Sequence, residues 1–312
     1  MKTAYYAIGL RCNLRCIFCP CSEEQPDYKY FTLEELKDTI EETLKVKDID
    51  NFLLSGGEPT IQKSFIPIVE YICQEKKRPL SLLTNAIVFS KNKFLERFLS
   101  AVGNSKFEMV TAVHNHIPEK HDYLTQTKGS FEKTLTGLKN CVSSGINTSV
   151  KYNIVNYNYK DLPEFIDFVY ETFPDEVGLI LCNIDISGFA RKNKDVIPVS
   201  FEKSNPYIEK ALDKVIKYMN NGWKRNVRIF TTPLCTLDPY YWYFINKSTK
   251  DDVAAYRSPD VIEENSKLMF DFPSGTGTPF DECKDCKVID ICPGSWESYA
   301  EYYGTGFLRP VN

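Results

Sequence analysis

Short apolar runs alternate with longer segments of helical period over the first 230 residues of the chain. The apolar runs predict strands at residues 3–9, 51–55, 80–84, 107–113, 147–155 and 177–186. Between them, apolar residues recur at helical spacing, which predicts helices at 33–44, from 65, around 94–99, and at 130–145, 162–171 and 206–220. Six strand-then-helix units predict an α/β fold with a parallel sheet, either open or curled as a partial barrel. In both arrangements the functional site lies at the carboxyl ends of the strands.

Two of the predicted helices carry clear end signals. Thr32 and Glu35 form a capping box, so the helix is expected to begin at Leu33. Ser130 is expected to cap the helix before the fifth strand, and Gly145 is placed to end it.

The alternating pattern breaks after residues 227–230. Residues 236–282 are rich in Tyr, Trp, Phe, Pro and Gly without a clear period, and a group of cysteines follows. We therefore expect two domains, a large one at residues 1–222 and a smaller one at 223–312.

Composition and charge exclude several classes of function. Lys and Arg total 38 against 42 Asp and Glu, so a net charge of −4 offers no general attraction for nucleic-acid phosphates. No apolar run reaches the length of a membrane span, and the N-terminus lacks an export signal. We therefore expect a cytoplasmic protein that binds neither nucleic acid nor membrane.

The chain has eleven cysteines, and without an export signal they indicate metal ligands and buried thiols in preference to disulfides. Cys73 and Cys141 fall on or beside the apolar faces of predicted helices. Core packing is the simplest role for both.

Cys12, Cys16 and Cys19 form a three-ligand loop directly after the first strand. Thiolates are the preferred ligands of iron-sulfur clusters, and three of them would leave one iron of a [4Fe-4S] cluster open to a substrate or cofactor. A structural zinc site with Cys21 as the fourth ligand, or a set of buried thiols, is the alternative.

Residues 56–59, Gly-Gly-Glu-Pro, follow the second strand and fall on the same rim as the cysteine loop. Alone, this sequence is equally typical of a tight surface turn. Together with the cysteine loop and with Thr84-Asn85 after the third strand, it resembles the radical S-adenosylmethionine (SAM) enzymes over residues 3 to about 190.

The resemblance implies a partial (β/α)6 TIM-like barrel in which Cys12, Cys16 and Cys19 hold a catalytic [4Fe-4S] cluster. SAM would bind the open iron and be cleaved to methionine and a 5′-deoxyadenosyl radical, which takes a hydrogen atom from a substrate. Backbone groups of Gly56 and Gly57 would contact the methionine part of SAM, with Glu58 accepting from its ammonium. The remaining cofactor-binding candidates are Phe18 near the adenine, Pro59 in the turn, Thr84, Asn85, His114 and Asn153.

The chain also departs from the pattern of many peptide-modifying members. His121-Asp122 and residues 129–131 (Gly-Ser-Phe) match it, but the fourth strand ends in Ala-Val-His-Asn at 112–115, where a serine usually contacts SAM. The histidines at 114, 116 and 121 suggest a pocket lining or surface positions, with a metal site as the alternative.

A second cysteine set, Cys235, Cys283, Cys286 and Cys292, resembles the auxiliary-cluster domains of radical SAM peptide maturases, called SPASM or, in shortened form, twitch. A further cysteine of that pattern would fall at position 296, which is Trp. The four thiols imply an auxiliary [4Fe-4S] cluster in a small C-terminal domain; a zinc ribbon is the alternative.

These resemblances imply a radical SAM enzyme that modifies a ribosomally made peptide or protein. The alternatives are a dehydrogenase or cyclase acting on a carbohydrate, nucleotide or cofactor precursor, and a non-catalytic iron-sulfur carrier or scaffold. Expected partners are an electron donor such as flavodoxin or ferredoxin and, because the first ligand is already residue 12, a separate leader-peptide-binding protein. Residues 240–280 could instead bind the peptide directly.

No catalytic acid, base or radical donor is identified by the sequence. Cys21, Cys182, Asp238 and Tyr240 are the candidates, and packing in the core or in a lid is the alternative for each.

Overall fold

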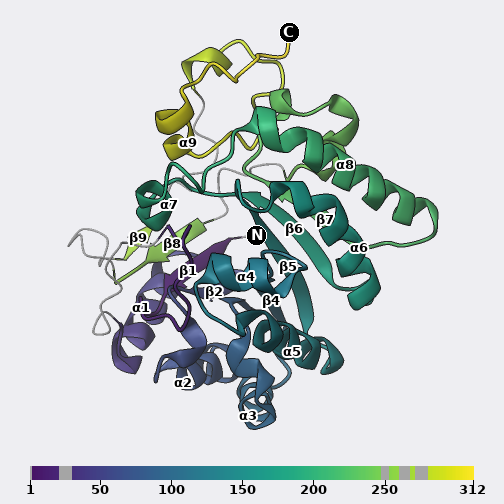
Figure 1. The fold of residues 1–312 in the computed structure, drawn as a ribbon. Helices are drawn as coiled ribbons and strands as arrows, with labels where there is room; N and C mark the ends of the chain where they lie inside the picture. Colours follow the sequence, from purple (N-terminus) through teal and green to yellow (C-terminus); the bar gives the residue numbers. More distant parts are fainter. Residues whose placement is uncertain (1, 21–29, 247–252, 260–267, 271–279) are drawn as a thin grey trace.

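The computed structural model describes residues 2–20, 30–246, 253–259, 268–270 and 280–312. Within these ranges, nine strands form one sheet in the order β7-β6-β5-β4-β3-β2-β1-β8-β9. Neighbouring strands from β7 across to β8 run parallel, and β9 is antiparallel to β8. The sheet curves without closing, and helices line its outer side (Figure 1). This confirms the predicted partial barrel.

The first six strands follow the predicted order, and three more follow them in the described part of the chain. They are β1 (Thr3–Ala7), β2 (Asn51–Ser55), β3 (Leu80–Thr84), β4 (Phe107–Ala112), β5 (Asn147–Ile154), β6 (Gly178–Asn183), β7 (Val227–Phe230), β8 (Val253–Arg257) and β9 (Met269–Phe270). The α-helices are α1 (Leu33–Val46), α2 (Phe65–Glu70), α3 (Asn92–Val102), α4 (Pro118–Thr125), α5 (Ser130–Ser143), α6 (Leu162–Thr172), α7 (Gly188–Lys192), α8 (Phe201–Asn220) and α9 (Glu297–Tyr303).

The helix ends agree with the sequence signals at α1 and at Gly145, which follows the C-cap of α5 with a φ of +76°, and they differ in two other places. Thr32 and Glu35 form the predicted capping box of α1. The prediction for Ser130 was wrong, because Gly129 is the N-cap and the Ser130 hydroxyl donates to Asp122 instead. Helix α8 begins at Phe201, five residues before the predicted start, and accommodates Pro206 within its second turn.

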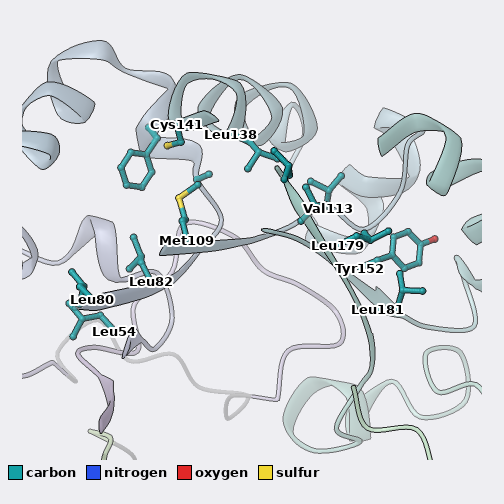
Figure 2. Packing of buried hydrophobic residues seen from close by; sticks show 14 of the residues in the cluster. Leu54, Leu80, Leu82, Met109, Val113, Leu138, Cys141, Tyr152, Leu179 and Leu181 are labelled. Carbon is teal, nitrogen blue, oxygen red and sulfur yellow. The ribbon is translucent and has the colours of Figure 1, made fainter. Parts of the chain in front are cut away.

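The core lies between the sheet and its outer helices. Alternate residues of the strands, among them Leu54, Leu82 and Leu181, are fully buried and face the helices, as the period of two requires. Figure 2 shows Met109 of β4 beside Leu138 and Cys141 of α5. Cys141 and Cys73 are both buried, which confirms them as core thiols.

Strands from the last third of the chain complete both sides of the sheet. β7 pairs with β6, and β8 pairs along β1 from Thr3 to Tyr6. β8 was not predicted because its five residues lack a strict apolar alternation. Residues 280–312, with α9, lie beside α8 and α7 (Figure 1). The division at residue 222 stays a prediction, and both of its parts contribute strands to one sheet.

Candidate active site at the carboxyl ends of the strands

The loop after β1 and the loop after β2 are joined by backbone hydrogen bonds. Gly57 N donates to Gly9 O at 2.9 Å, and Glu58 N donates to Arg11 O at 2.9 Å. Gln62 adds a bond from its Nε2 to Arg11 O at 3.2 Å. The Gly-Gly-Glu-Pro segment therefore lies directly against the residues that lead into Cys12.

Only glycine fits at positions 56 and 57. Gly56 has a φ of +126°, and a Cβ there would stand 2.3 Å from Gly9 O. A Cβ on Gly57 would stand 2.3 Å from Leu10 O. The two glycines thus allow a close approach of the two loops, which the sequence alone did not reveal.

Glu58 is engaged within the protein. Its carboxylate is 1% exposed and accepts from Thr60 N (3.1 Å), Thr60 Oγ1 (2.5 Å), Thr84 Oγ1 (2.7 Å) and Asn85 N (2.7 Å). Burial raises the pKa of the Glu58 carboxyl, and these hydrogen bonds act against that rise. Glu58 therefore links the end of β3 to the end of β2. The sequence predicted only a contact between Glu58 and the ammonium of SAM, and not this structural role.

Thr84 and Asn85 extend this connection to the cysteine loop. Asn85 Nδ2 donates to Asn13 Oδ1 at 2.7 Å, and Asn13 lies between Cys12 and Cys16. Sequence reasoning missed Asn13 and Thr60, and their polar side chains beside the two motifs were the available signal. The carboxyl ends of β1, β2 and β3 thus form one hydrogen-bonded unit around the cysteines.

The three thiols of the loop are close enough to influence one another. Burial raises the pKa of the Cys12 thiol to about 12 and that of Cys16 well above its ordinary value, and the neighbouring cysteines add to both shifts. A positively charged group is needed to keep these thiols ionised, and metal binding would release their protons. Cys21, the suggested fourth zinc ligand, lies outside the described residues.

Two helices that the sequence did not predict hold the cysteine loop in place. At the end of α4, Thr125 O accepts from Arg15 N and Leu124 O accepts from Ile17 N, both at 3.0 Å. At the start of α7, Phe189 N donates to Cys19 O at 2.9 Å. The loop backbone is therefore fixed on both sides.

Phe18, which lies between Cys16 and Cys19 in the sequence, packs inside the protein. It is 5% exposed and belongs to a small apolar cluster with Leu124, Val155, Ala190 and Ile197. Its ring meets the ring of His114 edge to face at a centroid distance of 4.8 Å. Phe18 thus anchors the cysteine loop to the end of β4.

His114 and His121 form a buried pair behind Phe18. His114 N donates to Nδ1 of His121 at 3.1 Å, and the rings stack at 5.3 Å. Within the described structure, Nδ1 of His114 and Nε2 of His121 have no hydrogen-bond partner. Burial lowers the pKa of His114 far below its ordinary value and that of His121 to about 4. Both rings are therefore neutral at pH 7.

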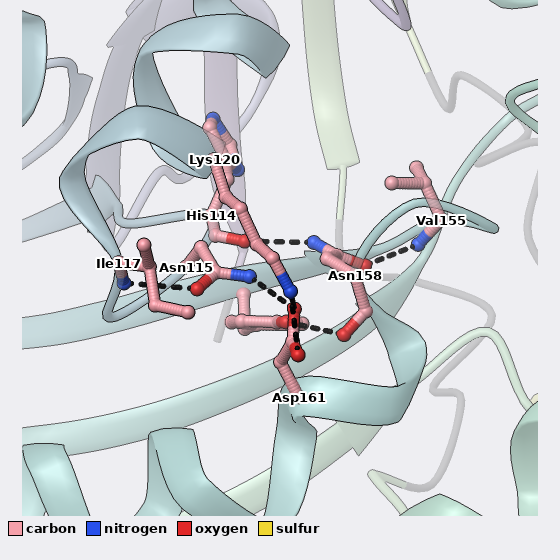
Figure 3. Close-up of polar contacts among 8 residues, drawn as sticks. His114, Asn115, Ile117, Lys120, Val155, Asn158 and Asp161 are labelled. Atoms are coloured by element: carbon pink, nitrogen blue, oxygen red, sulfur yellow. Dashed lines mark hydrogen bonds and ion pairs between the residues drawn. The ribbon is translucent and has the colours of Figure 1, made fainter.

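The segments after β4 and β5 are connected by a polar network (Figure 3). Asn158 Nδ2 donates to the carbonyl oxygen of His114 at 2.8 Å. It also donates to the carbonyl oxygen of Asn153 at 2.9 Å. Asp161 accepts from Asn115 Nδ2 at 2.7 Å and pairs with Lys120 Nζ at 2.6 Å. The network fixes the backbone around His114 and Asn153, the two candidates from these strands.

The second cysteine set also comes together. Burial raises the pKa values of Cys235 and Cys283, and Cys286 and Cys292 add to both shifts through charge. Backbone N–H groups donate to three of the sulfurs, from Leu234 to Cys292 (3.4 Å), from Arg309 to Cys235 (3.5 Å) and from Val311 to Cys286 (3.4 Å).

Trp296 stands where a further cysteine would complete the auxiliary pattern. Its Nε1 donates to Asn183 O at the end of β6, at 2.9 Å. Ser298 Oγ of α9 donates to Asp185 Oδ1 at 2.5 Å, and Tyr299 OH accepts from Phe201 N at 2.7 Å. Position 296 therefore joins the C-terminal region to the barrel.

Among the residues whose placement is described, no three His, Cys, Asp or Glu side chains converge as ligands of a single metal ion. Each cysteine of a [4Fe-4S] cluster binds a different iron, so its ligands are spread around the cluster. Two all-thiol sets on loops, each with mutual charge interactions, fit that kind of group.

The catalytic candidates are distributed over different surroundings. Cys182 is buried at the end of β6, where its sulfur lies 3.9 Å from Thr231 Oγ1. Asp238 caps the 3-10 turn Pro239–Phe244 through Tyr240 N, and the Tyr240 side chain is 66% exposed. Among the described residues, no hydrogen bond or ion pair that Asp238 or Tyr240 makes reaches the cysteine loop.

The curved parallel sheet with a three-cysteine loop after its first strand defines a class of barrel enzymes, and comparison with known proteins identifies the family. Residues 6–169 match the Radical SAM superfamily. The chain belongs to this family, which implies a [4Fe-4S] cluster and SAM as cofactors.

One curated relative is the GTP 3′,8-cyclase of Peptoclostridium acidaminophilum, 32% identical over 173 residues that cover 54% of this chain and 51% of the relative. Another is the Fe-coproporphyrin III synthase of Methanosarcina barkeri, 27% identical over 225 residues, covering 70% and 52%. The chain thus spans about half the length of these relatives.

Solved structures share the fold over nearly the whole chain. SuiB of Streptococcus suis bound to the precursor peptide SuiA has a TM-score of 0.68 at 13% identity, covering 96% of this chain and 72% of SuiB. The enzyme anSMEcpe with bound AdoMet has a TM-score of 0.69 at 14% identity, covering 99% and 90%. In the described part of this chain, no helix has the length and apolar character of a membrane span.

Proposed function

We propose that this radical SAM enzyme acts on a ribosomally made peptide or protein and carries a second, auxiliary [4Fe-4S] cluster. The observation that carries the proposal is the pair of backbone hydrogen bonds by which Gly57 and Glu58 hold Gly9 and Arg11, the residues that lead into the Cys12–Cys19 loop. A non-catalytic iron-sulfur carrier has no need of that second loop.

Cys12, Cys16 and Cys19 would hold the first cluster, and the backbone at Gly56 and Gly57 would contact SAM beside it. When both are bound, they supply a 5′-deoxyadenosyl radical that removes a hydrogen atom from the substrate. The hydrogen bonds of Glu58, Thr84 and Asn85 hold the two loops in fixed positions relative to each other. Phe18 and the His114–His121 pair exclude water behind the cysteine loop, because their rings fill that space.

The substrate class rests on two supports. The fold likeness to SuiB and anSMEcpe extends over 96% and 99% of this chain. SuiB was solved with a precursor peptide. The match to the GTP 3′,8-cyclase covers only 54% of this chain.

A cyclase acting on a nucleotide is the second candidate, favoured by 32% identity to the GTP 3′,8-cyclase. Incubation of the reduced enzyme with SAM and GTP, followed by mass spectrometry, separates the two. A cyclised product from GTP would establish the second candidate and contradict the first.

We also propose how the two clusters are divided along the chain and which proteins the enzyme works with. Residues 1–222 would carry the catalytic cluster, and residues 223–312 a twitch- or SPASM-like auxiliary cluster on Cys235, Cys283, Cys286 and Cys292. An electron donor such as flavodoxin or ferredoxin would reduce the enzyme, and a separate protein could present the peptide.

Formation of 5′-deoxyadenosine tests the enzymatic proposal. Anaerobically reconstituted protein, given dithionite and SAM, is expected to form it, and Cys16→Ala is expected to abolish the reaction. Cys141→Ala is the control, because this thiol lies in the core between α5 and the sheet. Cys286→Ala is expected to retain detectable cleavage without substrate. A folded wild-type protein that forms no 5′-deoxyadenosine would contradict the proposal.

A further inference from the structure

We propose that residues 308–311 act as a backbone clamp that sets the reduction potential of the second centre. This inference rests on the auxiliary cluster of the proposed function. It starts from two contacts: Arg309 N donates to Cys235 Sγ at 3.5 Å, and Val311 N donates to Cys286 Sγ at 3.4 Å. Both distances suit hydrogen bonds to sulfur, whose radius is larger than that of oxygen.

The sequence Arg309-Pro310-Val311 is suited to present two donors to one side. A residue before proline is restricted to extended backbone, and in an extended chain the groups of residues i and i+2 point the same way. Pro310, between them, has no N–H of its own. The segment therefore directs both of its donors to the cysteines and leaves none facing away.

The clamp is held at both ends. Lys287 N, next to Cys286, donates to Val311 O at 2.9 Å, and Leu308 N donates to Thr305 O at 2.9 Å. Just before the segment, the Phe307 ring packs against Phe201 of α8 at a centroid distance of 5.3 Å. Because the donors are fixed to the barrel and to the cysteine turn, they are in place whatever the charge of the centre.

Hydrogen bonds to ligand sulfurs are one of the means by which a protein tunes an iron-sulfur cluster. An N–H dipole stabilises negative charge on a thiolate, and that charge grows when the cluster takes up an electron. Donors from residues 309 and 311, with the third from Leu234 to Cys292, therefore favour the reduced state. Removing a donor must make the potential more negative.

Proline and alanine substitutions at the same positions distinguish the effect of the backbone N–H on the reduction potential from the effect of the side chain. Arg309→Pro and Val311→Pro remove the N–H, whereas Arg309→Ala and Val311→Ala keep it. The background is the full chain with Cys12, Cys16 and Cys19 replaced by Ala, so that only the second site binds a cluster. Iron and sulfide analysis should give about four of each per chain, as for one [4Fe-4S] cluster.

The readout is a redox titration followed by electron paramagnetic resonance. Each proline variant should shift the midpoint potential to a more negative value, and each alanine variant should leave it where it is in the background chain. A chain that ends at Leu308 lacks both donors without introducing a proline. It should shift the potential in the same direction, by at least as much.

The possible outcomes show whether the clamp fails alone or whether the auxiliary cluster fails with it. If the cluster is present but the chain ending at Leu308 and the proline variants keep the background midpoint, the clamp is overturned and the cluster stands. If the alanine variants shift as much as the proline variants, the side chains are responsible and the clamp is overturned. If the background chain binds zinc or no metal, both proposals fail. Circular dichroism confirms that each variant is folded.

Discussion

Gly57 shows how a single residue determines whether two functional loops can meet. A Cβ at this position would stand 2.3 Å from Leu10 O and 2.5 Å from Arg11 O, both of them backbone atoms. Neither can move without displacing the residues that lead into Cys12. The close approach of the loops thus depends on the missing side chain.

Gly57→Ala should separate the loops. We expect it to lower the free energy of unfolding by about 1–3 kcal/mol, as overpacking does, and to reduce 5′-deoxyadenosine formation by at least about tenfold. Gly306→Ala is the matched control, because a Cβ at Gly306 meets no atom within 4 Å. Urea unfolding and product analysis measure both effects, and equal behaviour of the two variants would contradict the explanation.

His121 makes the stability of the metal-free protein depend on pH. Burial lowers its pKa from 6.5 to about 4, so the unfolded chain binds a proton more readily than the folded one between these values. Stability from this group is present above pH 6.5 and is lost as the pH falls toward 4. This difference in pKa corresponds to at most about 3–4 kcal/mol of the free energy of unfolding.

Replacing His121 by Asn should weaken this dependence, because Asn Oδ1 can accept from His114 N but does not titrate. Urea unfolding at pH 7.5 and pH 5 should show a smaller loss for His121→Asn than for the wild type. Equal losses in the two proteins would mean that His121 does not contribute.

The residue types at the first site could be predicted from the sequence, but several of their contacts could not. The spacing of Cys12, Cys16 and Cys19 indicated a ligand set, and residues 56–59 indicated a partner loop. The hydrogen bonds of Glu58 to Thr84 and Asn85 depend on the register of two neighbouring strands, which a linear pattern does not contain.

The N-terminus of α5 is stabilised by a residue that lies outside the helix. Asp122 accepts from Gly129 N (2.5 Å), Ser130 Oγ (2.8 Å) and Phe131 N (2.9 Å). These bonds lower the pKa of the Asp122 carboxyl. Ser130 looked like the cap because a serine before an apolar run is the usual signal, whereas the real acceptor lies eight residues earlier.

Asp122→Ala should lower the free energy of unfolding by about 1–2 kcal/mol, the usual effect of removing a cap. Lys133→Ala, on the exposed side of the same helix, should change it by less than about 0.5 kcal/mol. Thermal or urea unfolding measures the difference, and similar values for both variants would argue against a capping role.

Helices α4 and α7 were missed for a related reason. Each is short, at 8 and 5 residues, and neither has a long apolar stripe. Their carbonyl and amide groups at the ends bond the cysteine loop, and only Leu124 and Ala190 from their faces pack against Phe18 in the apolar cluster. Period-based prediction does not detect a helix that acts through its backbone termini.

At the scale of the whole molecule, strands from beyond residue 222 lie at both edges of the open sheet. β8 covers β1 from Thr3 to Tyr6, and Tyr5 stacks on Tyr256 with ring centroids 5.5 Å apart. Removing residues 223–312 would expose the open edges of β1 and β6, which then lack their hydrogen-bond partners.

A protein limited to residues 1–222 should therefore be less stable than the full chain, with an earlier and broader thermal transition. Scanning calorimetry and size-exclusion chromatography at equal concentration compare the two. A sharp transition at the same temperature would show that the first 222 residues fold as an independent domain.

The position of β1 between β2 and β8 determines how late in synthesis the site can form. Thr3 pairs with Asn51 on one side and with Val253 on the other, so its second neighbour is synthesised about 250 residues later. Contacts so distant in sequence form slowly, and a chain emerging from the ribosome cannot make this one until most of it has been translated. During synthesis the cysteine loop therefore follows a strand with one open edge. We therefore expect the final enclosure of β1, and with it the rigid support of Cys12, to be among the last events in folding.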